Sequence, residues 1–336
     1  MTLPSLLLLA LLPPLATVRV QGPEITGEPS RRTGFQVAAD AAPAGCAVIG
    51  VTGTGSAADA CNRIAQAFSA GDLEKARQHA NLFRSEYPTL GAGFYWLGQI
   101  DFKQFRYVSA LRNLEASVDR SPSVAAAHVA LGLSYASLYQ YRLFEKEMLW
   151  VLEHAPADPL PYYNLGRYYF MQLDQPERGA NYLQKAVDRN PEDCRSSYYL
   201  GYYHEVMGNQ DTAKILYTKA STVARSQKVK FGAPFEGLAR LMLLEDRLSE
   251  SIHFAQEAVS TEPGSASARL FLGKLWIQSG NFGQGIKEFQ KAIELDPTDA
   301  AAHYQLSRAY LKIGKRSEAE NAQALFLKVR SVYSAE

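Results

Sequence analysis

Residues 272–300 read LGKLWIQSGNFGQGIKEFQKAIELDPTDA, and the small residues and the proline of this stretch decide the fold. A Leu-Gly pair opens the stretch, Gly285 follows twelve residues after Gly273, and Pro297 lies near its end. Small residues let two helices approach closely, whereas proline cannot lie inside a helix. The stretch therefore predicts two antiparallel helices joined by a turn and ended by the proline.

The same pattern recurs along most of the chain with a period close to 34 residues. Successive Leu-Gly pairs or their variants are spaced by 34, 34, 35, 38, 34 and 34 residues, and a proline column follows the same period with one member missing. Columns that share one period indicate an internal repeat. The pairs are Leu97-Gly98, Leu131-Gly132, Leu165-Gly166, Leu200-Gly201, Leu238-Ala239, Leu272-Gly273 and Leu306-Ser307, and the prolines are Pro88, Pro122, Pro156, Pro191, Pro263 and Pro297.

In the clearest copy, Leu272-Gly273 is followed by Trp276, Phe289, Ala292 and the closing proline, and this order resembles the tetratricopeptide repeat. The resemblance covers about residues 57–331. It implies an all-α fold, a right-handed superhelical solenoid of about eight helix-turn-helix units. One such helix pair cannot bury its own apolar face, so neighbouring units must stack.

The first 56 residues differ from the repeats. Residues 1–20 include the apolar run LLLLALLPPL, which has the length of a signal-peptide core and is too short to span a membrane. We expect a signal peptide or hydrophobic N-terminal segment there, and hence export to the periplasm or the extracellular space. The protein would be cytoplasmic if the segment is not a functional signal. Residues 21–56 are rich in Gly, Pro and Ala and predict a flexible linker, and residues 332–336 predict a short tail.

Three cysteines are too few for a disulfide framework, and their spacing does not fit a zinc site. In an exported protein, Cys46 and Cys61 could pair and tie the linker to the first helix, which would leave Cys194 free. Three unpaired thiols are equally compatible with the sequence.

Charge and motif content argue against several classes of function. The chain has 35 Lys and Arg against 34 Asp and Glu, so its net charge gives no reason to expect nucleic acid as a partner. The six histidines are scattered along the repeats, and no nucleophile, metal-binding or general acid–base motif is present. We therefore expect a non-catalytic protein with no cofactor and no metal.

The expected function is binding along the concave groove of the solenoid. The resemblance implies that positions two, five, nine and twelve of each unit's first helix line this groove. In the later units, positions five and nine are mostly Tyr, Arg and Lys; Arg can pair with carboxylates, and Tyr offers rigid contact area. We expect an extended acidic peptide or a partner protein's carboxylate terminus to bind there. The candidate residues are Tyr163, Arg167, Tyr198, Tyr202, Arg240, Lys274, Tyr304 and Arg308.

Two alternatives remain open for these residues. The tyrosines could pack across neighbouring units beneath a solvated basic face. Exported proteins that resemble this one also serve polysaccharide secretion or envelope assembly, and a Tyr- and Arg-rich groove suits an acidic glycan. Family members that bind chaperone tails use a Lys/Asn pattern of which only Asn164 lies at a comparable place, so we do not carry that ligand over.

Overall fold

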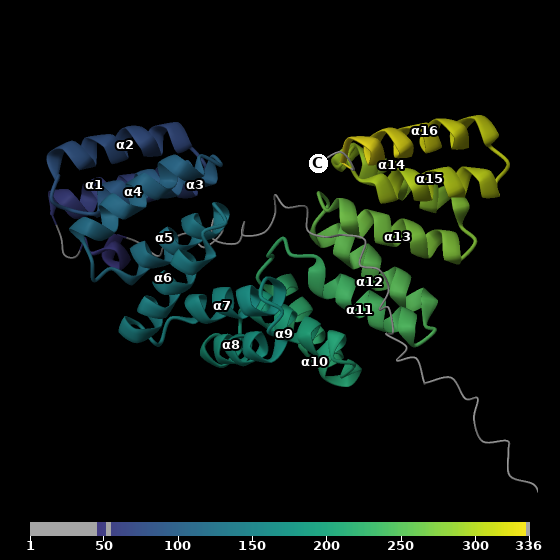
Figure 1. Cartoon of the computed structure of the whole chain (residues 1–336), viewed down its shortest axis with the longest axis horizontal. Helices are drawn as coiled ribbons and strands as arrows, with labels where there is room; N and C mark the ends of the chain where they lie inside the picture. The colour runs from purple at the N-terminus through teal and green to yellow at the C-terminus, as the bar shows by residue number, and fades with distance from the viewer. Residues whose placement is uncertain (1–45, 52–54, 334–336) are drawn as a thin grey trace, which may run out of the picture.

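The computed structural model describes residues 46–51 and 55–333 of the chain. Within these residues the fold contains sixteen α-helices and no strand, arranged as eight antiparallel pairs (Figure 1). The predicted all-α solenoid of about eight units is confirmed. The expected signal peptide and most of the expected linker lie outside the described residues.

Each pair forms one unit, so that α1 and α2 make unit 1 and α15 and α16 make unit 8. The solenoid begins one residue before the expected boundary at residue 57, and its last helix continues two residues beyond residue 331. The helices are α1 (Ser56–Ser69), α2 (Leu73–Glu86), α3 (Ala92–Lys103), α4 (Tyr107–Arg120), α5 (Ala125–Ser137), α6 (Tyr141–His154), α7 (Pro159–Met171), α8 (Pro176–Arg189), α9 (Cys194–Val206), α10 (Gln210–Ser226), α11 (Ala233–Leu244), α12 (Leu248–Thr261), α13 (Ala266–Gln278), α14 (Phe282–Leu295), α15 (Ala300–Lys312) and α16 (Arg316–Tyr333).

The small residues of the Leu-Gly column allow the two helices of a unit to touch. A Cβ added to Gly98 would stand 2.5 Å from Leu114 Cγ, and one added to Gly273 would stand 2.5 Å from Phe289 Cε1. Each of these partners is fully buried, so a larger residue would force the helices apart. The column therefore sets the distance between the helices of a unit.

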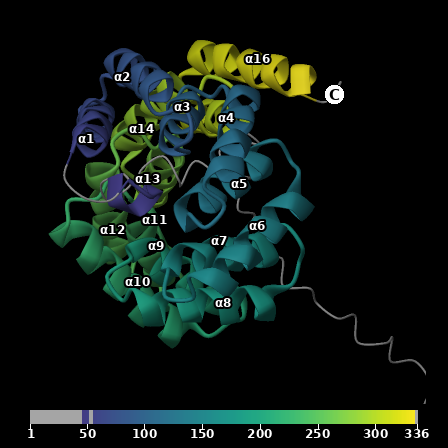
Figure 2. The same ribbon diagram turned by 90° about the vertical axis from the view of Figure 1, so that its left-hand side faces the viewer.

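The units stack into a curved array. Seen along its shortest axis, α1 to α4 lie at one end, α13 to α16 lie at the other, and α7 to α10 connect them below (Figure 1). Turned by 90°, the helices follow a nearly closed ring (Figure 2). Each unit contacts mainly its neighbours along the chain, as in a superhelical solenoid. Among the described residues, no helix has the length and apolar content needed to cross a membrane.

A short segment before the first unit packs against the solenoid. The 3-10 helix η2 (Cys46–Ile49) contacts α1, α3 and α5, and Cys46 forms a disulfide with Cys61 of α1. Ile49 is 2% exposed and Val51 is 6% exposed. These residues differ from the flexible linker expected through residue 56, because their apolar side chains join the core of units 1 to 3.

The third cysteine is kept apart from this disulfide. Cys194 opens α9, is buried against Ala220 and Ala224, and is a free thiol. Burial raises the pKa of Cys194 to about 11. The pairing of the other two cysteines therefore follows the first of the two arrangements that the sequence left open.

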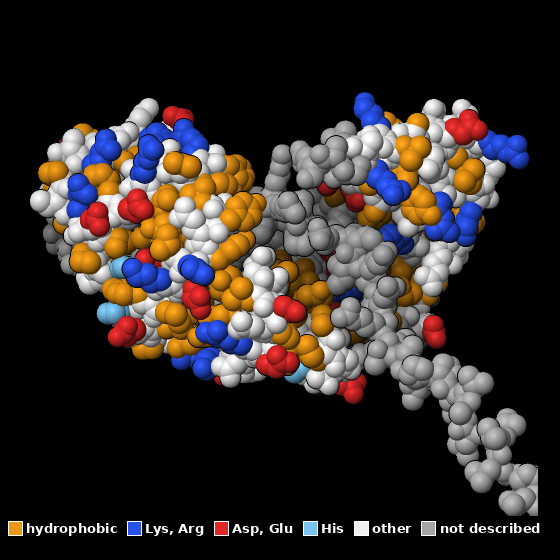
Figure 3. Space-filling model, viewed as in Figure 1, with side chains coloured by type: hydrophobic (Ala, Val, Ile, Leu, Met, Phe, Trp, Pro, Cys, Tyr) orange, Lys and Arg blue, Asp and Glu red, His pale blue; other side chains and the backbone are white. Residues whose placement is uncertain are grey.

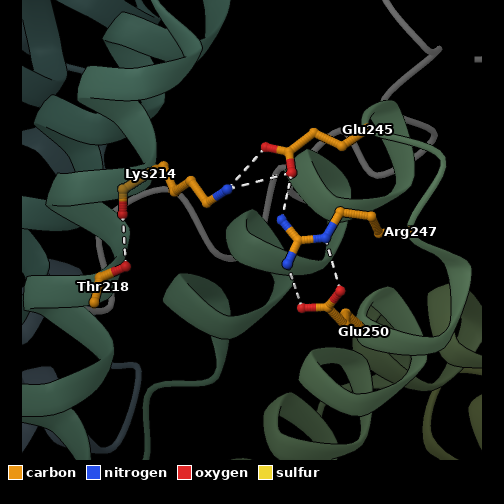
Figure 4. Close-up of polar contacts among 5 residues, drawn as sticks. All are labelled: Lys214, Thr218, Glu245, Arg247 and Glu250. Atoms are coloured by element: carbon orange, nitrogen blue, oxygen red, sulfur yellow. Dashed lines mark hydrogen bonds and ion pairs between the residues drawn. The ribbon is translucent and has the colours of Figure 1, made fainter.

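The one irregular step in the repeat lies between units 5 and 6. The extra residues lengthen α10 to 17 residues, where α2, α4, α6, α8, α12 and α14 have 14 each. An exposed ion pair bridges this junction (Figure 4): Lys214 Nζ lies 2.9 Å from Glu245 Oε1, and within unit 6 Arg247 contacts both Glu245 and Glu250. Thr218 donates to the backbone carbonyl of Lys214 one turn earlier in α10.

Candidate binding groove

The groove defined by positions five and nine of the first helices changes character along the array. We divide it into a first section over α3 and α5, a middle section over α7, α9 and α11, and a last section over α13 and α15. The sections differ in burial, charge and contacts, although the helix positions are equivalent.

The first section is apolar and covered. Tyr95 is 3% exposed, Val129 5% and Leu133 1%. Tyr95 shares a buried cluster with Ile49 of η2, accepts a hydrogen bond from Gln99 Nε2 at 2.8 Å, and has its pKa raised to about 12 by burial. The protein's own residues therefore occupy this part of the groove.

In the middle section, Arg167 lies between aromatic rings. Its Nη1 donates to the Tyr163 hydroxyl at 3.4 Å, and its guanidinium carbon lies 4.6 Å from the centre of the Tyr199 ring. Arg167 is 7% exposed and Tyr163 is 3% exposed, and burial raises the pKa of the Tyr163 hydroxyl. The structure thus places this pair as the packing alternative expects, with the cation held by tyrosines.

Tyr198 and Tyr202 lie side by side on α9. Their rings are nearly parallel with centres 6.4 Å apart, and Phe170 of α7 lies 5.5 Å from Tyr202. Tyr198 also contacts the buried Tyr217 of α10 at 5.5 Å. These two groove residues are half-buried and form an aromatic surface that continues from unit 4 to unit 5.

Arg240 is paired with Glu205, an acid that lies outside positions five and nine. Its Nε and Nη2 donate to the two carboxylate oxygens of Glu205 at 2.9 and 2.8 Å. The Tyr217 hydroxyl donates to the same carboxylate. Glu205 occupies position twelve of α9, so reading that position as well as five and nine would have found it. The charge of Arg240 is therefore compensated within the protein.

A second acid lies in the middle section at Glu236, position five of α11. Its pKa is raised to about 7, because burial raises it more than the charge of Arg240 lowers it, and the nearby Glu262 adds a smaller increase. Near neutral pH this carboxyl group is therefore poised between its two protonation states. Together with Glu205, it makes the middle of the groove less basic than positions five and nine predicted.

In the last section, Lys274 is half-buried, whereas Tyr304 and Arg308 of unit 8 are exposed. Tyr304 is 39% exposed, and the guanidinium carbon of the exposed Arg308 lies 5.6 Å from its ring centre. Partial burial lowers the pKa of Lys274, and the carboxylate of Asp299 opposes this shift. Figure 3 shows Lys and Arg side chains distributed over α13 to α16.

The eight candidate residues thus form three groups. Tyr163 and Arg167 are joined within unit 4, and Tyr198 and Tyr202 extend their aromatic surface into unit 5, where Glu205 binds Arg240. Lys274, Tyr304 and Arg308 lie apart from them in units 7 and 8. In the part of the chain that the structure describes, no group of three or more His, Cys, Asp or Glu residues could hold a metal ion.

Two parts of the chain match family models of this repeat. Residues 161–193 match the tetratricopeptide repeat, and residues 273–314 match a TPR repeat. The fold is that of a tetratricopeptide-repeat solenoid, and these two stretches match the repeat in sequence. The two matches fall in unit 4 and in units 7 and 8.

Curated relatives are similar over most of this chain but are much longer. Tetratricopeptide repeat protein 37 of Xenopus laevis is 24% identical over 256 residues, which is 75% of this chain and 16% of the relative. Superkiller complex protein 3 of Mus musculus is 22% identical over 268 residues, which is 78% of this chain and 17% of the relative. The chain therefore spans about a sixth of the length of these curated relatives.

Solved structures share the fold at low sequence identity. The Cut9–Hcn1 hetero-tetramer of the APC/C matches with a TM-score of 0.63 and 17% identity, covering 73% of this chain and 48% of that one. Yeast Tom70 matches with a TM-score of 0.58 and 14% identity, covering 85% of this chain and 65% of that one. This likeness concerns the fold alone.

Proposed function

We propose that this solenoid is a non-catalytic interaction scaffold whose concave groove binds an extended polypeptide segment of a partner protein. One observation carries the proposal: residues 46–51 already lie as a short polypeptide against three first helices of the groove. Tetratricopeptide-repeat proteins generally act as protein-interaction scaffolds, which supports the same function.

The three sections of the groove indicate which segment would fit. Lys274 and Arg308 favour ligand carboxylates over units 7 and 8, because a cation can form charge-assisted hydrogen bonds with a carboxylate. The paired rings of Tyr198 and Tyr202 favour apolar or aromatic ligand side chains over unit 5. Glu236, when ionised, disfavours acidic ligand residues in the middle section, because the nearby Arg240 is already paired with Glu205. The proposed ligand is therefore acidic at one end and apolar in its centre.

We also propose that the protein works after export, in the periplasm or the extracellular space. The Cys46–Cys61 disulfide supports this, because such bonds persist in oxidising compartments and are rare in the cytosol. Trapping the thiols in intact native cells would test the compartment. We expect only Cys194 to be labelled after denaturation; labelling of all three cysteines would place the protein in a reducing compartment.

Charge reversal in the last section tests the binding function. Lys274→Glu with Arg308→Glu changes two groove residues, and Lys287→Glu with Lys328→Glu is a matched control on the second helices α14 and α16. After cross-linking in native cells, we expect the groove variant to lose about tenfold or more of the partner that the wild-type chain captures. The control should capture as much as wild type.

Equal capture by the groove variant would contradict the proposal. An acidic glycan is the second candidate ligand, because tyrosine rings and arginine suit sugar stacking and uronate pairing. A panel of acidic glycans and acidic peptides separates the two classes. Retention of glycans without retention of any peptide would replace the polypeptide ligand by a glycan.

A further inference from the structure

Two first helices of the solenoid carry the same residues on one face. Residues 163–170 of α7 read YNLGRYYF, and residues 304–311 of α15 read YQLSRAYL. Both helices therefore have Tyr at position five, Arg at position nine and a large apolar side chain at position twelve. None of the other six first helices that the structure describes combines Tyr and Arg at positions five and nine. Helices α7 and α15 thus offer the same groups to a helix that packs beside them.

In unit 4 this surface is covered by α9 of the next unit. The ring centre of Tyr199 lies 5.9 Å from that of Tyr163 and 4.6 Å from the guanidinium carbon of Arg167. One turn later on α9, the ring centre of Tyr203 lies 6.0 Å from that of Phe170. Tyr163 and Arg167 are consequently buried. A helix with two aromatic side chains four residues apart thus closes the surface of α7.

In unit 8 the same surface is open. Among the described helices, α15 and α16 form the end of the array, and α15 contacts mainly α13, α14 and α16 (Figure 1). Tyr304 is 39% exposed, Leu311 is 58% exposed and Arg308 is exposed as well. The terminal repeat of a solenoid ordinarily carries a polar outer face, which keeps the protein soluble. Unit 8 instead presents, on its outer face, the residue types with which unit 4 holds α9.

The second helix of unit 8 extends this open surface. Gly179 of α8 and Ala319 of α16 are the small residues at which each second helix touches the first helix of its unit. Eight residues after each of them, the chain has an apolar side chain. Val187 is buried in a cluster with Leu200 of α9, whereas Leu327 is 53% exposed. The place that α9 fills beside α8 is therefore open beside α16.

One substitution distinguishes the two surfaces. Phe326 of α16 takes the place that Ala186 has in α8, one residue before the apolar side chain just compared. Its ring centre lies 5.4 Å from that of Tyr304, which nevertheless keeps its exposure. The open surface of unit 8 is therefore richer in aromatic rings than that of unit 4, which favours aromatic side chains on an occupant.

We propose that the outer surface of unit 8 docks an α-helix of a partner protein that presents two aromatic side chains four residues apart. This helix lies on α15 and α16 as α9 lies on α7 and α8, and so continues the junction that the chain forms between its own units. Its first ring lies over the Arg308 guanidinium, where a cation–π contact is favourable, and its second ring meets Leu311. The inference goes beyond the proposed binding of an extended segment, because this occupant is helical and lies at the end of the solenoid.

The protein's own α9 supplies a defined probe for this surface. The probe is a fluorescent, lactam-bridged helical peptide of residues 194–206 with Cys194→Ser, and its binding to the full chain is measured by anisotropy. We expect saturable binding with a Kd below about 200 µM. Tyr304→Ala or Leu311→Asp in the full chain should weaken binding about tenfold or more, as usual for the central residues of an interface. Ile215→Asp, which also replaces an exposed apolar side chain, should leave binding unchanged.

Variants of the probe test the aromatic spacing. Tyr199→Ala in the peptide should weaken binding about tenfold, because this ring covers the Tyr–Arg pair in unit 4. Tyr198→Ala is the matched control and should bind as the original peptide does, because in the solenoid this ring packs against Tyr217 and Phe231. No saturable binding, equal affinity for the wild-type and Leu311→Asp chains, or equal losses in the two peptides would overturn the proposal.

Sedimentation equilibrium of the full chain without the probe tests the other possible occupant. We expect a monomer whose mass Leu311→Asp does not change. A dimer that Leu311→Asp dissociates would overturn the proposal and assign the surface to a second copy of this chain. The two solenoid variants keep Lys274 and Arg308, so the proposed binding of an extended segment stands or falls separately.

Discussion

Leu133 and Arg308 occupy the same position of their first helices, in units 3 and 8, yet their environments are opposite. Leu133 is 1% exposed within a cluster that includes Phe102 and Val129, whereas Arg308 lies on the surface beside Tyr304. The repeat sets the direction in which a side chain points. The environment of that side chain depends on which other residues pack against the groove in that unit.

Equivalent groove positions therefore serve folding at one end of the solenoid and binding at the other. Units 1 to 3 bury groove positions against η2 and the neighbouring units, so substitutions there should affect folding. Unit 8 exposes a tyrosine and a cation at the equivalent positions, Tyr304 and Arg308, so substitutions there should affect binding.

The largest expected effect is the difference in folding stability between two alanine variants at position nine. Leu133→Ala removes a fully buried side chain and should lower the free energy of unfolding by about 2–5 kcal/mol. Arg308→Ala should change it by less than about 0.5 kcal/mol, as usual for a surface site. Urea denaturation followed by circular dichroism measures both values. Equal losses of unfolding free energy in the two variants would show that the two positions do not differ in their role in folding.

The next largest effect concerns the Cys46–Cys61 disulfide beside the first section of the groove. Cys46→Ser with Cys61→Ser opens a loop with a sequence separation of 15, and a loop of this size contributes about 3 kcal/mol of stability. Because the units of a solenoid are coupled mainly to their neighbours, the loss should be local. Hydrogen exchange should accelerate in α1 to α3 and stay unchanged in α15 and α16. Uniform acceleration would contradict a local effect.

A smaller effect is expected at the ion pair of the middle section. Arg240→Ala leaves Glu205 without its bidentate partner and should destabilise the fold by about 2 kcal/mol, because hydrogen bonds to charged groups contribute about 1.5–3 kcal/mol. A double-mutant cycle with Glu205→Ala isolates the pair. We expect a coupling free energy of about 1 kcal/mol or more; additive losses would show that the two side chains do not act as a pair.

The smallest effect is a pH dependence from Glu236. Its folded-state pKa of about 7 lies above its ordinary value of 4.5, so the folded protein holds a proton that the unfolded chain releases between these values. Stability from this group is therefore fully present below pH 4.5 and falls as the pH rises towards 7. Partial exposure limits the loss to about 1.5 kcal/mol.

Glu236→Gln should remove this fall in denaturation curves recorded from pH 4.5 to 8, while Glu294→Gln on the exposed face of α14 should keep it. An unchanged slope in Glu236→Gln would assign the pH dependence to another group.

Much of the fold could be predicted because the repeat carries local physical constraints. Gly98 and Gly273 mark places where only a small residue fits, and the prolines mark helix ends, so the helix pairs follow from the sequence alone. The candidate groove was harder, since exposure depends on partners distant in the chain. Arg240 could not be assigned to Glu205 without the curvature that brings α9 and α11 together, and nothing local shows that Ile49 is buried.

The burial of Cys194 has a consequence for how the protein acquires its disulfide. Thiol–disulfide exchange requires a thiolate, and with a pKa of about 11 only about one Cys194 molecule in 10,000 is deprotonated at pH 7. Cys46 and Cys61 also leave the ribosome before Cys194 is synthesised. Once the chain is folded, burial keeps Cys194 out of thiol–disulfide exchange, so the Cys46–Cys61 bond should not rearrange in the native state.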